Sequence, residues 1–366
     1  MIFKVAALSS KSMKWVSVLL CMKLLCTLFV IFVFSRFSPL IDADLYLSGL
    51  YGSEHPLRTR IIQGIVNMLL SFGSSVFVHW IFGVLSLTGV LYYYCLDGTR
   101  WQVSLPLLLP SALIWTSVVG KESIFYGAFT LVLVIWARFA VQKCVFRDFV
   151  FLAVSVAICA LLRPHYALVI FWLFVSIVMI EKVKVASGIW LCLLALFAVS
   201  IICAFVWEPL LWRGFGGIDP EARASRFVIL GIEPGTHAGF ATYKSLLPLG
   251  ALLGITGPMP TELFERPVFI PFFLEGLLVM FFPMGVYFYV SKQFFDGKKQ
   301  FVKIFWISLV PAILALVALH APFGFLNPGS AIRWRVNFEA AFHMAPLLLF
   351  FEFLDGDRFA NNSLPS

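Results

Sequence analysis

The chain has 366 residues, of which 61% are hydrophobic and only 13% are charged. A water-soluble enzyme is excluded, because no compact core of this length could hide 40 Phe and 11 Trp side chains from water. The formal net charge of +8 is scattered between apolar runs and forms no continuous basic stripe, so no nucleic-acid partner is expected. This composition, with a mean hydropathy of +0.96, predicts a polytopic membrane protein.

Apolar runs bounded by charge, Pro or Gly predict an all-α bundle of about ten transmembrane helices, each of roughly 20 residues. The runs lie near residues 15–35, 74–96, 103–119, 123–140, 149–162, 166–180, 187–206, 270–291, 302–319 and 340–354. The first follows a basic stretch, as in a secretory signal, but it is too long and lacks a small-residue cleavage site, so it is expected to remain as a span.

Two apolar stretches, Ile61–Phe72 and Leu246–Gly257, are only twelve residues long and are predicted to be interfacial or re-entrant helices on the outer face. We expect one integral membrane domain over residues 1–366, with an outer loop region at 207–269 that contains the second of these helices. Lys23 lies inside the first apolar run and is expected to snorkel to the inner interface, with a functional role as the alternative.

The positions of the lysines predict how the chain is oriented in the membrane. With the N-terminus inside, ten of the thirteen lysines fall on the cytoplasmic side, which also places the C-terminus in the cytoplasm. Ten arginines fall on the opposite side, where positive charge is disfavoured during insertion. An anionic partner on that face is one explanation, because a guanidinium group suits phosphate or carboxylate. Local pairing with Asp or Glu in long translocated loops is the other.

The first outer loop contains Asp42, Asp44 and Tyr46 and runs on to Arg58 and Arg60. Two carboxylates two residues apart can share a divalent cation, or one can act as a catalytic base that its neighbour orients. The alternative is a solvated loop in which one of the two aspartates caps the following helix.

Two tight outer turns carry further cationic groups. Lys121 is expected at the outer membrane boundary, where it can neutralise a lipid phosphate or pair with Glu122. Arg163 is held at the end of its helix by Pro164 and is a second candidate for phosphate binding. His165 can donate a hydrogen bond to a substrate or be purely structural.

The last outer segment begins with Asn327-Pro-Gly-Ser, a turn that can start a helix, and continues to Arg333, Trp334 and Arg335. A helix N-terminus with two nearby arginines makes an anion site. Trp334 can stack on a sugar ring or lie in the interfacial aromatic belt. Glu275 lies within a predicted span, where it serves a proton relay or bonds to a neighbouring helix.

The outer face therefore offers carboxylates in its first loop and cationic groups at three later helix ends, which suits a lipid-linked phosphate substrate. A polyprenyl (pyro)phosphate sugar would anchor its tail between spans and present its anomeric carbon to an acceptor beside the aspartates. The sequence contains no Gly-rich phosphate loop and no Cys/His metal cluster.

One span followed by an outer loop with Asp42-Ala-Asp44-Leu-Tyr46, then many spans ending near an Arg-bearing loop, resembles the GT-C superfamily of membrane glycosyltransferases. Leu113-Ile-Trp-Thr-Ser-x-x-x-Lys-Glu122 and Asn327-Pro-Gly-Ser-x-x-Arg-Trp-Arg335 are similar to segments of membrane proteins associated with bacterial surface-polysaccharide synthesis. The resemblance implies a lipid-phosphate sugar donor, a bacterial plasma-membrane location, and Asp42 or Asp44 as catalytic base, of which we favour Asp42.

We expect inverting transfer at a cavity on the outer face, with chain-distant acids and guanidinium groups converging there. The candidate site comprises Asp42 and Asp44 as acids, Arg58, Arg60, Lys121, Arg163, Arg333 and Arg335 at the donor phosphate, and Tyr46, His165 and Trp334 as substrate contacts. The expected partners are the polyprenyl-linked donor, a glycan or lipid-linked acceptor, and membrane lipids. No cofactor is expected beyond a divalent cation at Asp42 and Asp44. The alternatives are an O-antigen or capsule repeat-unit polymerase, a transporter of lipid-linked oligosaccharides, and a non-catalytic assembly subunit.

Overall fold

The computed structural model describes residues 10–38, 40–52, 54–96, 100–182, 212, 215, 225–233, 236–295, 299–325 and 328–362, and all its regular elements there are helices. Four of these are long and apolar enough to cross a membrane: Ser12–Arg36, Lys121–Ala140, Gln300–Phe325 and Pro328–Phe353. Two bent pairs bring the count to six if each pair is one span. The all-α membrane fold is thus confirmed, while the full set of ten spans stays a prediction.

The chain divides into two compact units, which are described separately. Unit 1 comprises Met1–Ala167 and His343–Ser366, and unit 2 comprises Leu168–Phe342.

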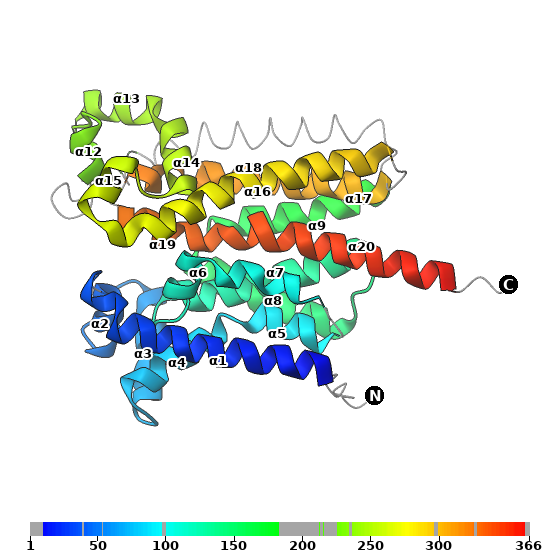
Figure 1. Cartoon of the computed structure of the whole chain (residues 1–366), viewed down its shortest axis with the longest axis horizontal. Helices are drawn as coiled ribbons and strands as arrows, with labels where there is room; N and C mark the ends of the chain where they lie inside the picture. Colours follow the sequence, from blue (N-terminus) through cyan, green and yellow to red (C-terminus); the bar gives the residue numbers. More distant parts are fainter. Residues whose placement is uncertain are drawn as a thin grey trace. The chain divides into compact units, whose positions relative to one another are not determined.

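Unit 1 is built around one buried helix, α7. Its elements are α1 (Ser10–Phe32), η1 (Phe34–Arg36), α2 (Ile41–Leu47), α3 (Leu57–Leu70), α4 (Ser75–Leu85), α5 (Thr88–Cys95), η2 (Trp101–Leu108), α6 (Pro110–Trp115), α7 (Lys121–Ala140), α8 (Phe146–Leu162), the start of α9 (Tyr166–Lys182) and α20 (Ala345–Asn362). α7 packs against α4, α5, α8 and α20, and α1 packs against α4, α5 and α6. Figure 1 shows α2 and α3 at the C-terminal end of α1.

Two predicted spans of unit 1 are not single straight helices. The run at 74–96 is α4 followed by α5, bent by 54° at Ser86 and Leu87. The run at 103–119 is η2, then the short α6, then a non-helical segment from Thr116 to Gly120. Pro106 has no N–H group for a continuous helical ladder, and Pro110 occupies the first position of α6, so the apolar run restarts rather than continuing.

Unit 2 is built around α14. Its elements are the rest of α9, α12 (Ser225–Ile229), α13 (His237–Ser245), α14 (Leu247–Thr256), α15 (Pro260–Glu265), η3 (Pro267–Phe269), α16 (Ile270–Phe295), α17 (Lys299–Lys303), the π-helix η4 (Ile304–Leu309), α18 (Val310–His320), η5 (Ala321–Phe325) and α19 (Pro328–Glu339). α14 packs against α16, α18, α19 and η5. An aromatic core that includes Phe215, Phe227 and Tyr243 fills the space beside α13.

Several expectations for unit 2 can be compared with these elements. The predicted span at 187–206 lies outside the described residues. In the outer loop region, the described residues form α12 to α15. The predicted helix Leu246–Gly257 is confirmed as α14, and its interfacial or re-entrant position stays a prediction. α14 meets α13 at a bend of 60°.

The segment with Arg333 and Arg335 is a helix rather than a loop. α19 begins at Pro328 and continues through the π-helix η6 (Ala340–Met344) into α20. Proline is tolerated in the first turn of a helix because its N–H group would have no helical partner there. The predicted start of a helix at this point is therefore confirmed from Pro328 on, but Arg333 and Arg335 lie within that helix.

Candidate functional site

Asp42 and Asp44 lie in the first turn of α2. Leu40 occupies the N-cap position and makes no side-chain cap bond, so neither aspartate is the cap. Residues two apart in a helix point to different sides, and Asp42 is half-buried while Asp44 is exposed. This geometry does not favour a cation shared by the two, and no cluster of three potential metal ligands occurs in the described part of the chain.

Tyr46 connects α2 to α3 and to the start of α7. Its side chain is 1% exposed, and its carbonyl oxygen accepts a hydrogen bond of 2.6 Å from the Gln63 amide nitrogen. Burial raises the pKa of the Tyr46 hydroxyl, and the nearby negative charges of Glu122 and Asp42 raise it further. Tyr46 therefore lies near both Asp42 of α2 and Glu122 in the first turn of α7.

The first turn of α7 contains a buried ion pair. Nη2 of Arg163 donates to Oε1 of Glu122 over 3.0 Å, and the two side chains are 3% and 6% exposed. Lys121 begins α7 and is half-buried. Arg163 thus pairs with an acid of the protein, although this acid lies 41 residues away on another helix rather than in the same loop.

His165 and Arg58 lie close to this pair. Burial, followed by the positive charges of Arg163 and Arg58, lowers the pKa of His165 to about 4, so the imidazole is neutral near pH 7. Nε of Arg58 is buried and finds no hydrogen-bond acceptor among the described residues. Arg60, two residues further along α3, is exposed.

We call this group of side chains the acid–arginine cluster. It consists of Asp42, Tyr46, Arg58, Glu122, Arg163 and His165, all in unit 1. Four separate segments contribute to it: α2, the first turn of α3, the first turn of α7 and the turn between α8 and α9.

The neutral state of His165 makes the stability of the protein depend on pH. Because the unfolded chain binds a proton near pH 6.5 and the folded chain only near pH 4, folding should weaken as pH falls between these values. The contribution is at most about 3 kcal/mol. Thermal denaturation of the solubilised protein at pH 7 and pH 5 measures it, and His165→Gln should show a smaller drop. An equal drop in both proteins would contradict this assignment.

Side chains of two helices, α1 and α4, form hydrogen bonds with the non-helical segment from Thr116 to Gly120. From α1, Nζ of Lys23 donates to the hydroxyls of Thr116 and Ser117, and the Thr27 hydroxyl donates to the Ser117 carbonyl over 3.0 Å. From α4, Nδ1 of His79 accepts from the Val119 N–H over 2.9 Å. Two backbone groups of the break, the Ser117 carbonyl and the Val119 N–H, thereby find partners inside the protein, as non-helical backbone in a membrane protein requires.

The expectation that Lys23 snorkels is wrong. Its side chain is fully buried, and it lies near the middle of the candidate span Ser12–Arg36. At 1.5 Å per residue each end of that span is more than about 16 Å away, beyond the reach of a lysine side chain. The hydroxyls of Thr116 and Ser117 hold the ammonium group instead.

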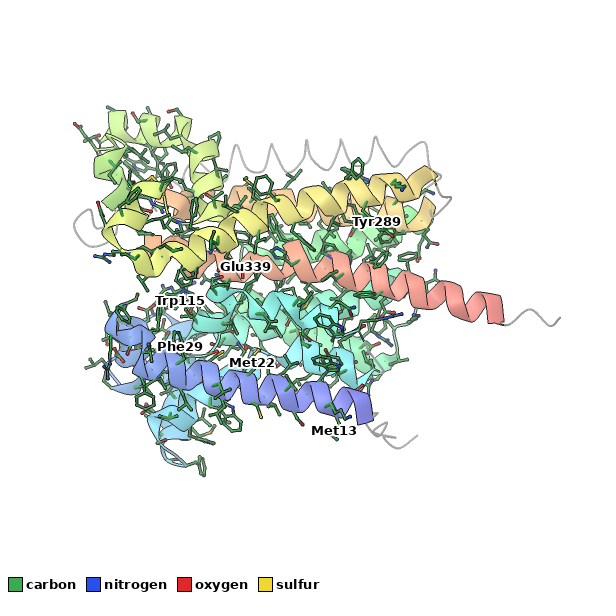
Figure 2. The ribbon with its side chains drawn as sticks, viewed as in Figure 1. Met13, Met22, Phe29, Trp115, Tyr289 and Glu339 are labelled. Atoms are coloured by element: carbon green, nitrogen blue, oxygen red, sulfur yellow. The ribbon has the colours of Figure 1, made fainter. Side chains whose placement is uncertain are left out.

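In unit 2, Arg335 lies inside the helical packing rather than on a surface. Its guanidinium group lies 3.2 Å from Glu275 and 3.4 Å from Glu339, and all three side chains are fully buried. It also donates to the carbonyl oxygens of Ile255 and Phe272, each over 3.0 Å. The expectation that Glu275 bonds to a neighbouring helix is confirmed, and Glu339 is labelled in Figure 2.

Two other predicted site residues of α19 also meet protein groups. The Trp334 ring stacks on Phe323, with centroids 3.6 Å apart, and is half-buried. Arg333 is half-buried. The predicted convergence of Asp42 with Arg333 and Arg335 would join the two units, and it stays a prediction.

Arg226, like Arg163 and Arg335, is paired with a buried glutamate. It binds both carboxylate oxygens of Glu262 at 2.8 and 2.7 Å, and it donates to the carbonyl oxygens of Gly257 and Gly324. Three arginines assigned to the outer face are thus paired with acid inside the protein.

Sequence reasoning missed the partners rather than the charged residues. Glu122 was considered only as a partner of Lys121, and the hydroxyls of Thr116 and Ser117 were not considered as ligands of Lys23. The available signal was a polar Thr-Ser pair followed by Gly120 inside an apolar stretch. Trp115, labelled in Figure 2, precedes this pair, and its ring lies 6.4 Å from that of Phe34.

The apolar helices and the helix break buried between them define a multi-pass membrane protein. Residues 77–223 match the model of a family described as "Predicted membrane protein (DUF2142)". The described part of the match runs from α4 through α9 and includes Glu122 and Arg163. No curated protein sequence and no solved structure matches the chain.

Proposed function

We propose that the protein is a membrane glycosyltransferase of the GT-C type. It uses a polyprenyl-(pyro)phosphate-linked sugar on the extracytoplasmic face of the bacterial plasma membrane and serves the synthesis of a cell-surface polysaccharide or glycoconjugate. The acceptor is a glycan or a lipid-linked sugar. Ten spans, with both termini in the cytoplasm, are part of the proposal.

The acid–arginine cluster is the observation that supports this function. It combines a half-buried carboxylate, Asp42, with a buried guanidinium nitrogen of Arg58 that has no acceptor among the described side chains and backbone. The neutral imidazole of His165 lies close to Arg58. A phosphate oxygen is the acceptor that a buried guanidinium N–H prefers, because the hydrogen bond is charge-assisted.

The reaction would proceed by inversion at the anomeric carbon. The acceptor hydroxyl oxygen forms the new bond to this carbon, and the bond to the phosphate oxygen breaks with its electron pair. Asp42 accepts the hydroxyl proton, while Arg58 and Lys121 stabilise the leaving phosphate. Arg163, whose guanidinium group also pairs with Glu122, is the third proposed phosphate contact in unit 1. Tyr46 and His165, both in unit 1, are the proposed sugar contacts.

The exchange Asp42→Asn tests the proposed base. Transfer should fall by about 10²–10⁴-fold, the usual contribution of a general base, while expression and the melting temperature stay near wild type. The measurement is sugar transfer in membranes of a deletion strain that carries the variant. Glu54→Gln is the matched control, because Glu54 is an exposed acid of the same loop. Full activity of Asp42→Asn would overturn the assignment, and a loss confined to Asp44→Asn would move the base to Asp44.

Deleting the gene distinguishes the alternatives. Loss of a branch or terminal sugar from the surface glycan supports the transferase. Accumulation of single unpolymerised repeat units would indicate a repeat-unit polymerase instead. Lipid-linked intermediates trapped on the cytoplasmic side would indicate a transporter.

A further inference from the structure

Lys23 is an ionisable residue near the middle of a candidate span, and the proposed reaction does not use it. Its side chain is fully buried, and its ammonium group donates to the hydroxyls of Thr116 and Ser117. Both partners are neutral, and within the described part of the chain no carboxylate forms an ion pair with Lys23. Ionisable side chains at this depth are costly and mark functional positions, so this lysine calls for a role.

The two hydroxyls that meet Lys23 already use their hydrogen atoms elsewhere. The Thr116 hydroxyl donates to the carbonyl oxygen of Ala112, and the Ser117 hydroxyl donates to that of Leu113. Because a hydroxyl has a single hydrogen, each of these oxygens can accept from Lys23 but cannot donate to another group. The ammonium group therefore supplies the donor for both oxygens at the point where α6 ends and the non-helical segment begins.

The segment from Thr116 to Gly120 is held on its other side as well. Val118 and Val119 are 4% and 2% exposed. From α4, His79 accepts from the Val119 N–H over 2.9 Å. From the first turn of α7, the Ser123 hydroxyl donates to the Val118 carbonyl over 2.7 Å. Hydrogen bonds thus connect α1, the buried segment and the start of α7 in one continuous series.

The start of α7 carries two charged residues of the proposed site. Lys121 is the first residue of α7, and Glu122, the second, pairs with Arg163 at 3.0 Å. A close-packed interior transmits a displacement to its neighbours rather than absorbing it. A change in the contact between Lys23 and the hydroxyls should therefore shift Lys121 and Glu122, although Lys23 itself touches neither the donor nor the acceptor in the proposed reaction.

We propose that Lys23 is a positioning residue, whose ammonium group sets where α7 begins and thereby presents Lys121 to the donor phosphate. The inference rests on the proposed function, in which Lys121 stabilises the leaving phosphate. Lys23 acts through the hydroxyls of Thr116 and Ser117, which it holds at the end of α6. The charge inside the span is then retained for the geometry of the site rather than for contact with lipid or substrate.

The exchange Lys23→Met removes the ammonium group and keeps a side chain of similar length. The KM for the sugar donor should rise about tenfold, the loss of one charge-assisted hydrogen bond to phosphate, while the KM for the acceptor stays the same. Val30→Ala is the matched control, because it removes buried contacts from α1 seven residues away. This control should lower the melting temperature without changing the donor KM, since unfolded protein reduces only the maximal rate. An unchanged donor KM in Lys23→Met would overturn the proposal.

The double variant Lys23→Met, Lys121→Gln tests whether Lys23 acts through Lys121. Two residues that act in one series give non-additive effects, so Lys23→Met should raise the donor KM less than about twofold once Lys121 is already replaced. A purely structural role would give independent effects. A further tenfold rise in the double variant would therefore overturn the proposal.

Hydrogen–deuterium exchange of the full-length protein in nanodiscs tests the same link without sugar transfer. In Lys23→Met, residues 116–123 should exchange at least about tenfold faster, while α8 exchanges as in the wild type. If Lys23→Met does not fold, Thr116→Val, which removes one of the two acceptors of the ammonium group, is measured in the same way. Unchanged exchange at residues 116–123 would overturn the proposal. Faster exchange in a protein that transfers no sugar would support the role of Lys23 at the start of α7 and contradict only the proposed function.

Discussion

Replacing Arg163 with methionine is expected to lower the free energy of unfolding by about 3–5 kcal/mol, the cost of removing one partner from a buried ion pair. The carboxylate of Glu122 would lose the guanidinium group 3.0 Å away while remaining almost fully buried. The loss is measured by thermal or denaturant-induced unfolding of the solubilised protein. An Arg163→Met variant as stable as the wild type would contradict the prediction.

The double variant Glu122→Gln, Arg163→Met separates stability from function. With both charges removed, no buried charge from the pair remains, and most of the stability should return. A stable double variant that has lost sugar transfer would support a direct role of Arg163 at the donor phosphate. A stable double variant that transfers sugar at the wild-type rate would limit Arg163 to holding α7 and the turn after α8 together.

Replacing Arg335 with methionine is the second change with a large expected effect, again about 3–5 kcal/mol of unfolding free energy. Its guanidinium group serves Glu275, Glu339 and two backbone carbonyls, and none of the three charged side chains reaches solvent. Removing it leaves two carboxylates inside unit 2 without the positive charge between them. The free energy of unfolding, or the yield of monodisperse solubilised protein, measures the loss.

Glu339→Gln is the matched comparison for Arg335→Met. It removes one carboxylate at 3.4 Å but leaves the closer contact to Glu275 at 3.2 Å and both carbonyl contacts. We therefore expect a clearly smaller loss of stability than for Arg335→Met. If Arg335→Met folded as well as Glu339→Gln but failed to use the donor, the guanidinium group would serve the donor phosphate rather than the packing of α19.

The buried position of the Arg335 guanidinium group could not be predicted from the sequence, because its neighbours, including Gly257, are remote in the chain. Gly257 has a φ of +84°, and a Cβ atom there would lie 2.7 Å from the Arg335 guanidinium group. Ile255, Phe272 and Glu275 complete the surroundings from positions 60 to 80 residues earlier in the chain. The local sequence Arg-Trp-Arg after a turn is equally typical of an exposed anion site, so its neighbours alone could not distinguish the two.

Some helix boundaries likewise depend on residues that are remote in the chain and could not be predicted from the local sequence. The apolar lengths that predict the first span and the span beginning near residue 123 agree with α1 and α7, because twenty apolar residues have few alternatives to a helix in lipid. The break at Thr116 to Gly120 has nearly the same hydropathy as a continuing helix. Its stability depends on Lys23, Thr27 and His79, which belong to other helices.

Composition and the lengths of the apolar runs are enough to predict a helical multi-pass membrane protein, because they require no knowledge of which side chains become neighbours. The same residue pattern also singled out Asp42, Asp44 and the outer arginines, but not Glu262 or Glu339. Which arginines are neutralised inside the protein follows from the folded arrangement alone, because an ion pair depends on the distance between side chains that are remote in the chain. For Arg163, Arg226 and Arg335 that partner is a buried glutamate.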